Sequence, residues 1–151
     1  MIGSGYSNAL PPWQRRTIVG SIWCLALSGV AWLPLHYLLG AGSGQLPHPA
    51  EVWLMRWHGL AVVGGLFAAG IVAAGHVRRG WQLRIHRRSG TIICVAGILT
   101  VASGYALAYL VPEAWHPATG WLHVVLGLAA FGAGLLHWRE RSAPTRSSAP
   151  P

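Results

Sequence analysis

Four long apolar runs alternate with short polar segments along the chain. They cover residues 18–39, 52–77, 91–111 and 119–138. Each run can cross about 30 Å of hydrocarbon as an α-helix that rises about 1.5 Å per residue. Backbone groups in lipid must be hydrogen-bonded within the chain, and a helix achieves this within one segment. The pattern therefore predicts an all-α fold, a transmembrane four-helix bundle.

The segments outside these runs are polar and rich in Gly, Pro and Ser. Residues 1–16 are expected to form an N-terminal tail, residues 17–138 the membrane domain, and residues 139–151 a disordered C-terminal tail. The first apolar run is longer than the apolar core of a cleavable signal peptide. We therefore expect it to remain in the protein as the first span.

The composition indicates that lipid is the solvent of this chain. Only 9% of the residues are charged and 53% are hydrophobic, whereas about a quarter of the residues of a soluble domain are charged. The net charge of +8 comes from arginines that lie between the apolar runs, so binding to nucleic acid is not expected. Cys24 and Cys94 lie inside apolar runs and outside any C-x-x-C pair, which argues against covalent haem attachment and a zinc ribbon.

The arginines are distributed unequally between the two sides of the predicted bundle. Ten of the eleven lie in the N-terminal tail, the middle loop 78–90 and the C-terminal tail, and Arg56 alone falls on the other side. An excess of positive charge marks the cytoplasmic side of a membrane protein. The sequence thus predicts a multi-pass protein of the cytoplasmic membrane, with both termini in the cytoplasm.

Histidines carry the candidate chemistry, because ionisable groups within a span are costly and usually mark a functional site. His58 and His76 in the second run are 18 residues apart, which is about five turns and about 27 Å along one helix face. His123 and His137 in the fourth run are 14 residues apart, about 40° and about 21 Å from each other. The two runs are parallel, so one outer pair and one inner pair are expected at matching depths. Each pair can ligate one haem iron axially.

Small residues lie between the histidines on both faces, where a porphyrin needs room. They are Val62, Gly65, Ala69 and Val72 in the second run and Gly127, Ala130 and Gly134 in the fourth. Small residues also let two helices pack closely, which is the alternative interpretation. Zinc or copper would require three or four clustered ligands, and no Asp or Glu lies within a span to complete such a site or a proton path. We therefore favour two bis-His haems.

Three other residues are candidates near the haems. His36 ends the first run on the outer side, and His86 opens the third on the inner side, so both are alternative ligands. His86 is equally a candidate for binding a haem propionate or a quinone. Arg56 lies two residues before His58 and is the expected partner of an outer haem propionate, because arginine forms paired hydrogen bonds with carboxylates.

Six short motifs carry a family resemblance: WHGL (57–60), GHVRRGW (75–81), HRRSG (86–90), LTVASGYALAYL (99–110), WLHVVLGL (121–128) and LLHW (135–138). Together they resemble small bacterial four-helix b-type cytochromes, of the cytochrome b-561 type and the haem-carrying membrane anchors of hydrogenases and formate dehydrogenases. The resemblance covers residues 51–138 and implies two b haems, and it supports His58, His76, His123 and His137 as ligands. It also implies electron exchange between a quinone pool and a periplasmic redox partner. Several members take a ligand from the cytoplasmic end of the first helix, where this chain has no histidine.

The sequence accordingly predicts a membrane b-type cytochrome that relays electrons between the quinone pool and a redox protein, as one subunit of a hetero-oligomer. One alternative is a quinol oxidoreductase acting alone, with Tyr105, Tyr109, Glu113 or His86 supplying polar groups near a haem edge. A second alternative is a haem-free structural membrane subunit. A metal or proton transporter is least favoured, because the spans lack acidic residues.

Overall fold

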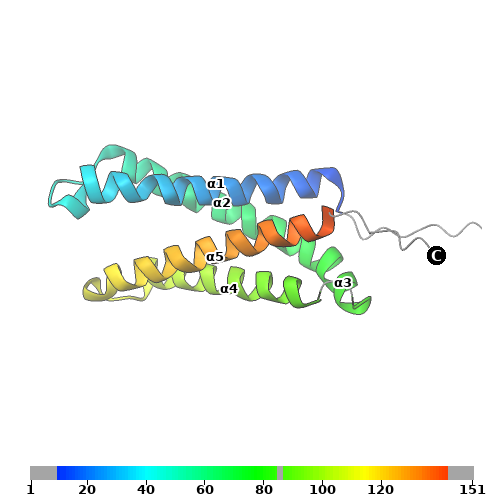
Figure 1. Cartoon of the computed structure of the whole chain (residues 1–151). Coiled ribbons are helices and arrows are strands. Elements are labelled where there is room, and N and C mark those ends of the chain that lie inside the picture. The colour runs from blue at the N-terminus through cyan, green and yellow to red at the C-terminus, as the bar shows by residue number, and fades with distance from the viewer. Residues whose placement is uncertain (1–9, 85–86, 143–151) are drawn as a thin grey trace, which may run out of the picture. The chain divides into compact units, whose positions relative to one another are not determined.

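The computed structural model describes residues 10–84 and 87–142, which form helices joined by short connections (Figure 1). No strand occurs within these two ranges. Four helical stretches in them are long and apolar enough to cross a membrane: Pro12–Ser43, Pro49–Gln82, Arg87–Tyr109 and Glu113–Arg139. The predicted all-α class with four membrane-length helices is therefore confirmed, and it is the character of a multi-pass membrane protein.

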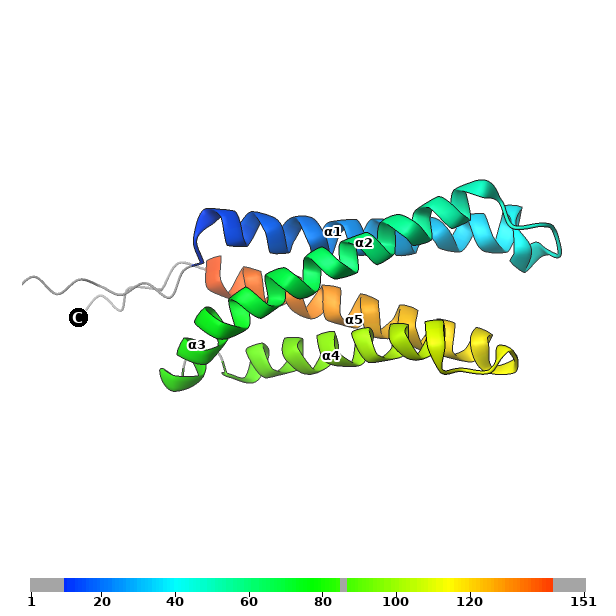
Figure 2. The ribbon, with the colours of Figure 1, turned by 180° about the vertical axis from the view of Figure 1, so that it is seen from behind.

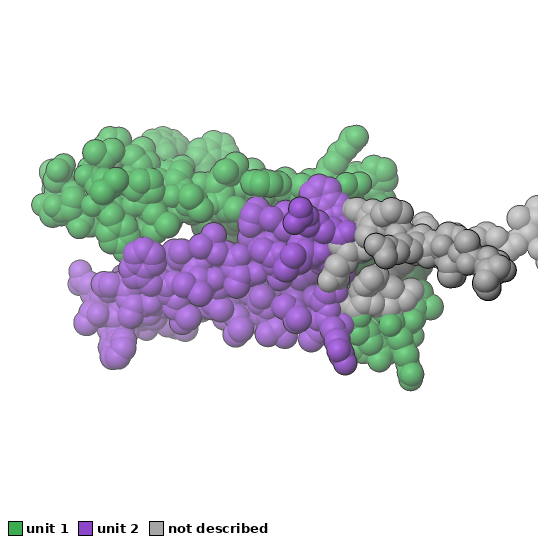
Figure 3. All heavy atoms as spheres, in the orientation of Figure 1, with its two compact units in different colours: residues 1–87 green, residues 88–151 purple. Residues whose placement is uncertain are grey.

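The chain divides into two compact units, residues 1–87 and residues 88–151, which Figure 3 colours green and purple. Unit 1 contains α1 (Pro12–Pro34), the π-helical turn η1 (Leu35–Leu39), the 3-10 turn η2 (Ala41–Ser43), α2 (Pro49–Val72), the π-helical turn η3 (Ala73–Val77) and α3 (Arg78–Gln82). Unit 2 contains nearly all of α4 (Arg87–Tyr109), the 3-10 turn η4 (Glu113–Trp115) and α5 (His116–Ser142).

Three helix ends differ from the sequence prediction. α1 begins at Pro12, inside the predicted tail, because proline in a first turn has its φ preset and lacks only an amide that the helix leaves unpaired. α3 prolongs the second span into the predicted middle loop, and α5 reaches Ser142 in the predicted disordered tail. Arginine, glutamine and glutamate are good helix formers, which favours both extensions. The rest of the predicted tails, residues 1–9 and 143–151, lies outside the described residues.

Unit 1 is a hairpin in which α1 runs alongside α2 in both ribbon views (Figures 1 and 2). Small side chains form the contact between the two helices. A Cβ atom placed on Gly65 would lie 3.6 Å from side-chain atoms of both Ser21 and Leu25. Ala68 is the one apolar residue among those described that is buried, at 3% exposure. Such small residues let two helices approach closely.

Large apolar side chains cover the outer surfaces of both units. Leu27 and Phe67 in unit 1 and Ile98 and Leu136 in unit 2 expose 61%, 70%, 67% and 61% of their surfaces. In water each exposed square ångström of such surface costs about 25 cal/mol relative to burial. Lipid hydrocarbon removes that cost, so these surfaces are suited to contact with a bilayer.

Two π-helical turns interrupt unit 1, and each contains a candidate histidine. η1 follows Pro34, which has no backbone N–H to donate, and it includes His36. η3 interrupts the second span and includes His76. Turns of this kind are rare and occur frequently at functional sites. The two π-helical turns thus contain His36 and His76, which are two of the histidines that the sequence singles out.

Candidate functional site

His58 lies on α2 and is hydrogen-bonded to α1. Its Nδ1 is 2.9 Å from Oγ of Ser28. The Ser28 hydroxyl donates its single proton to the carbonyl oxygen of Cys24 at 2.6 Å, so the ring nitrogen of His58 donates in the bond to Ser28. In a neutral imidazole the lone pair is then on Nε2. This is the tautomer of a metal-ligating histidine, which almost always donates its other ring N–H to a protein acceptor.

His123 on α5 has the same arrangement within unit 2. Its Nδ1 is 3.0 Å from Oγ of Ser103 on α4. Ser103 donates its proton to the carbonyl oxygen of Thr100 at 2.9 Å, so the ring again supplies the proton of the Ser–His bond. Ser28 and Ser103 are each only 8% exposed. Two separate hairpins thus hold a histidine in the same tautomer by a buried serine.

His137 provides a third case, also within unit 2. Its Nδ1 lies 3.0 Å from Oγ of Ser89 on α4. Ser89 and Ser103 are 14 residues apart, and so are His123 and His137 on the neighbouring helix. Because α4 and α5 are uninterrupted α-helices, equal spacings bring both serine–histidine pairs into register. The sequence reading missed these serines, although the matched spacings were a signal that could have found them.

His76, the fourth predicted ligand, lies half-buried in η3. The calculation that placed it on one face with His58 assumed 3.6 residues per turn throughout. A π-helical turn closes its hydrogen bonds over five residues, so that calculation does not extend to His76. His86, the alternative ligand of the inner side, lies outside the described residues.

A glycine follows each of the three serines, and two of these glycines lie close to the histidine ring. A Cβ atom on Gly29 would be 3.5 Å from Cε1 of His58. On Gly104 it would be 3.0 Å from Cε1 and 3.4 Å from Nδ1 of His123. On Gly90 it would meet nothing within 4 Å. At His58 and His123, the serine therefore accepts the ring proton, and the following glycine leaves room for the ring because it has no side chain.

His36, the alternative outer ligand, forms an ion pair with the start of α2. Its Nδ1 is 2.8 Å from Oε2 of Glu51, and its ring stacks on Trp32 with centroids 4.2 Å apart. Glu51 is 5% exposed and also accepts the backbone N–H of His48 at 2.9 Å. The side chain of His48 in turn accepts the N–H of Ala50, which completes a capping box. The cluster ties η1 to the N-terminus of α2.

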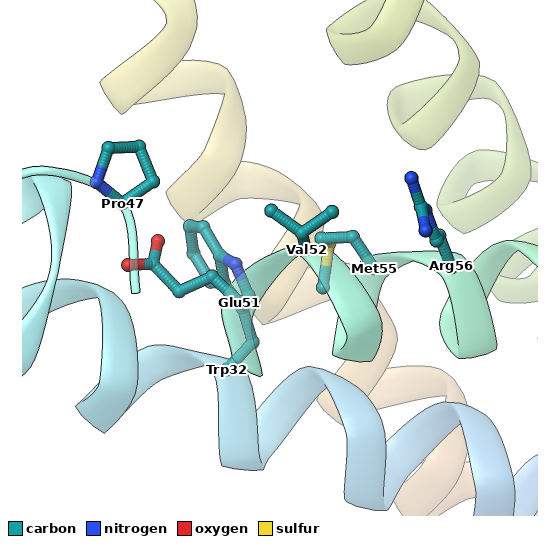
Figure 4. Close-up of a pocket in the computed structure, with 6 residues that line it drawn as sticks. All are labelled: Trp32, Pro47, Glu51, Val52, Met55 and Arg56. Atoms are coloured by element: carbon teal, nitrogen blue, oxygen red, sulfur yellow. The ribbon is translucent and has the colours of Figure 1, made fainter. Parts of the chain in front are cut away.

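A shallow hollow lies beside this cluster in unit 1 (Figure 4). Its lining residues are Trp32, Pro47, Glu51, Val52, Met55 and Arg56. The Glu51 carboxylate lies near Pro47, and Arg56, the predicted propionate partner, lies at the opposite end. Arg56 is exposed, and its guanidinium carbon lies 5.0 Å from the centre of the Trp53 ring. The guanidinium thus makes a cation–π contact with a neighbour on the same helix.

The small residues predicted to line a porphyrin have different surroundings. Gly65 faces α1, and a Cβ atom on Gly127 would lie 3.9 Å from Thr100 of α4, so both belong to contacts within their own hairpins. That location favours the helix-packing interpretation at these two positions. A Cβ atom on Gly134 would meet nothing within 4 Å. Ala69 is exposed, and Ala130 is half-buried.

The residues considered for a quinone site lie on the surface of unit 2. Tyr105 and Tyr109 are 58% and 75% exposed, and their ring centroids are 4.9 Å apart. Glu113 is exposed in η4.

Within residues 10–84 and 87–142, no three or more His, Cys, Asp or Glu side chains are grouped so as to hold a metal ion. Haem differs from such centres because its porphyrin supplies four ligands and the protein only the axial ones. Comparison with protein-family models, with curated proteins and with solved structures finds no match for this chain. The function is therefore inferred from the side-chain arrangement and the sequence.

Proposed function

We propose that this chain is a membrane b-type cytochrome. It binds two haems b, an outer one through His58 and His123 and an inner one through His76 and His137. Each haem takes one histidine from the second predicted span and one from the fourth, as the matching depths in the sequence indicate. The protein relays electrons between the quinone pool and a periplasmic redox protein, as a subunit of a hetero-oligomer. It lies in the bacterial cytoplasmic membrane, with both termini in the cytoplasm.

The observation that carries this proposal is the serine at Nδ1 of His58, His123 and His137. The rings of His58 and His123 donate through Nδ1, which leaves the lone pair on Nε2 and fixes the ring orientation, and both conditions favour ligation of iron. When bound, haem supplies an iron that cycles between its ferric and ferrous states. The chain supplies the axial nitrogens and holds their rings at a fixed tautomer.

The apolar surroundings suit this role. Ligands within a lipid-embedded segment exclude water from the iron, and burial with second-shell hydrogen bonds sets its reduction potential. Positive charge on the inner side of the predicted bundle supports the proposed orientation, because the middle loop and the two tails hold ten of the eleven arginines.

A haem-free structural subunit is the second candidate, and one feature favours it. Each serine–histidine bond lies within a single hairpin. It therefore gives the imidazole ring a hydrogen-bond partner inside lipid even when no cofactor is bound. The two candidates differ in what the purified protein contains. Colour and haem content therefore separate them directly.

The test is the reduced-minus-oxidised absorption spectrum of the purified full-length chain, with haem b quantified per chain. We expect about two haems per chain, because four histidines form two axial pairs. The controls are His48→Ala at the N-cap of α2 and His116→Ala at the first residue of α5, which lie at predicted outer ends of the spans and should keep both haems. A folded, colourless protein would overturn the cytochrome and leave the structural subunit. Oxidation of a quinol analogue by the purified haem protein would then test whether it acts alone.

A further inference from the structure

The two predicted outer ligands are held by identical dipeptides on different helices. Ser28–Gly29 on α1 lies beside His58, and Ser103–Gly104 on α4 lies beside His123. The serines supply two of the three buried polar residues among those described. A buried hydroxyl with both its proton and a lone pair engaged has a defined direction. The same Ser–Gly arrangement therefore occurs beside both histidines, and the abundance of small residues in the helices does not by itself explain it.

Each serine acts on the electronic state of the ring that it contacts. The hydroxyl oxygen accepts the Nδ1 proton, because the hydroxyl proton is already donated to Cys24 or Thr100. An acceptor at this proton raises the basicity of the opposite nitrogen and so strengthens its bond to a ferric ion. A neutral hydroxyl does this less than a carboxylate would, because it adds no negative charge next to the ring.

The glycines act on the rotation of the ring. The Cε1–Nδ1 edge of His123 lies where a Cβ atom of Gly104 would be, at 3.0 and 3.4 Å. The corresponding distance from Gly29 to Cε1 of His58 is 3.5 Å. A side chain at Gly104 would press on the ring edge of His123, whereas one at Gly29 would make an ordinary contact with His58. The hydrogen bond and the close approach together fix both the tautomer and the plane of the ring.

We propose that Ser28 and Ser103 are positioning residues for the haem ligands His58 and His123, and that each serine lowers the midpoint potential of the haem bound by its histidine, because it holds the ring as an Nδ1 donor. This inference rests on the proposed function. Removal of either hydroxyl makes the ligated nitrogen less basic, which favours the ferrous state and raises the potential. A haem that neither His58 nor His123 binds keeps its potential, because the two serines are hydrogen-bonded to these two histidines.

The test is an optical redox titration of the purified full-length chain carrying Ser28→Ala or Ser103→Ala. Loss of an outer-shell partner of a metal ligand typically changes metal affinity or activity by about 10–100-fold. We expect at least about a tenfold increase in the ferrous-to-ferric ratio at a fixed potential, or about 59 mV for a one-electron couple. Ser28→Thr and Ser103→Thr retain the hydroxyl and should titrate as the wild type. Ser21→Ala is the matched control on α1, since Ser21 faces Gly64 and Gly65 rather than a histidine.

The outcomes separate this inference from the proposed function. A raised midpoint potential of one haem in each alanine variant supports it. If the haems of Ser28→Ala and Ser103→Ala keep the midpoint potentials of the wild type and of Ser21→Ala, the proposed role of the serines is wrong. The cytochrome proposal would still stand. Absence of haem from the wild type would overturn both. If an alanine variant does not fold, electron paramagnetic resonance of the ferric Gly104→Ala protein tests the same ring, and an unchanged signal contradicts the inference.

Discussion

Units 1 and 2 are two helical hairpins that both hold a histidine by a serine of the neighbouring helix, but their helices differ in regularity. Each has a Ser–Gly step on its first long helix that contacts a histidine on its second. In unit 2 both helices are uninterrupted, whereas in unit 1 the π-helical turns η1 and η3 break the regular repeat. A spacing argument based on 3.6 residues per turn therefore holds for His123 and His137 but does not extend from His58 to His76.

The largest test of this comparison removes the outer histidines one at a time. If the proposed cytochrome function is right, His58→Ala and His123→Ala should each lose about one of two haems, because each removes one proposed axial ligand. The measurement is haem b per chain, with the absorption band of the haem that remains. Loss of different bands in the two variants would show that the two hairpins do not share a haem. His48→Ala and His116→Ala serve as controls.

A second test concerns the ion-paired outer end of unit 1. A Cβ atom on Gly40 would overlap the Glu51 carboxylate, so Gly40→Ala should destabilise the protein by about 1–3 kcal/mol through overpacking. Glu51→Gln should act in the same direction, because it removes the charge that pairs with His36. Glu113→Gln is the matched control in unit 2, where the carboxylate is exposed. Equal thermal unfolding temperatures for Glu51→Gln and Glu113→Gln would contradict a stabilising role for the ion pair.

A third test compares Gly29 and Gly104, the two glycines that lie next to a histidine ring. Gly104→Ala should cost about 1–3 kcal/mol, because the ring edge 3.0 Å away is held by Ser103 and has little room to move. Gly29→Ala makes an ordinary contact at 3.5 Å, so its helix-propensity gain of about 0.5–1 kcal/mol should dominate.

Controls for these glycine substitutions lie on the same helices. Gly97 on α4 and Gly20 on α1 have nothing within 4 Å of an added Cβ atom, so Gly97→Ala and Gly20→Ala should both raise the thermal unfolding temperature. If Gly104→Ala is as stable as Gly97→Ala, the ring of His123 is not confined as described.

The smallest expected effect is that of Arg56. Its guanidinium makes a cation–π contact with Trp53, which contributes about 0.5–1 kcal/mol at an exposed site. Arg56→Ala should therefore change the unfolding temperature only slightly. A change in the midpoint potential of the outer haem in this variant, with normal stability, would support the predicted propionate contact. An unchanged potential would assign Arg56 to the surface alone.

Much of the fold followed from the sequence, for a physical reason. A segment in lipid must satisfy its own backbone and present apolar side chains, so hydropathy and length identify a span without any knowledge of its neighbours. The helix ends at Pro12, Gln82 and Ser142 were harder to predict from the sequence, because a helix can continue beyond the residue at which the membrane-spanning segment ends. The π-helical turns were missed for a related reason, since regular periodicity was assumed throughout.

The site was predicted only in part. The sequence singled out His58, His123 and His137 as costly polar residues inside spans, and it recorded SG only as part of longer motifs. It could not assign Ser28 to His58, because 30 residues and a loop of unknown path separate them. It also treated Gly65 and Gly127 as space for a cofactor, whereas both contact the neighbouring helix of their own hairpin.

The sequence by itself determined four apolar spans, their asymmetric arginines and the polar residues that must find partners within them. These properties depend on each segment's own exchange between water and lipid. Only the tertiary structure decided which serine meets which histidine, and therefore which ring nitrogen carries the proton. A hydrogen bond requires two atoms within about 3 Å, and that distance depends on how antiparallel helices align after a turn, which local periodicity does not specify.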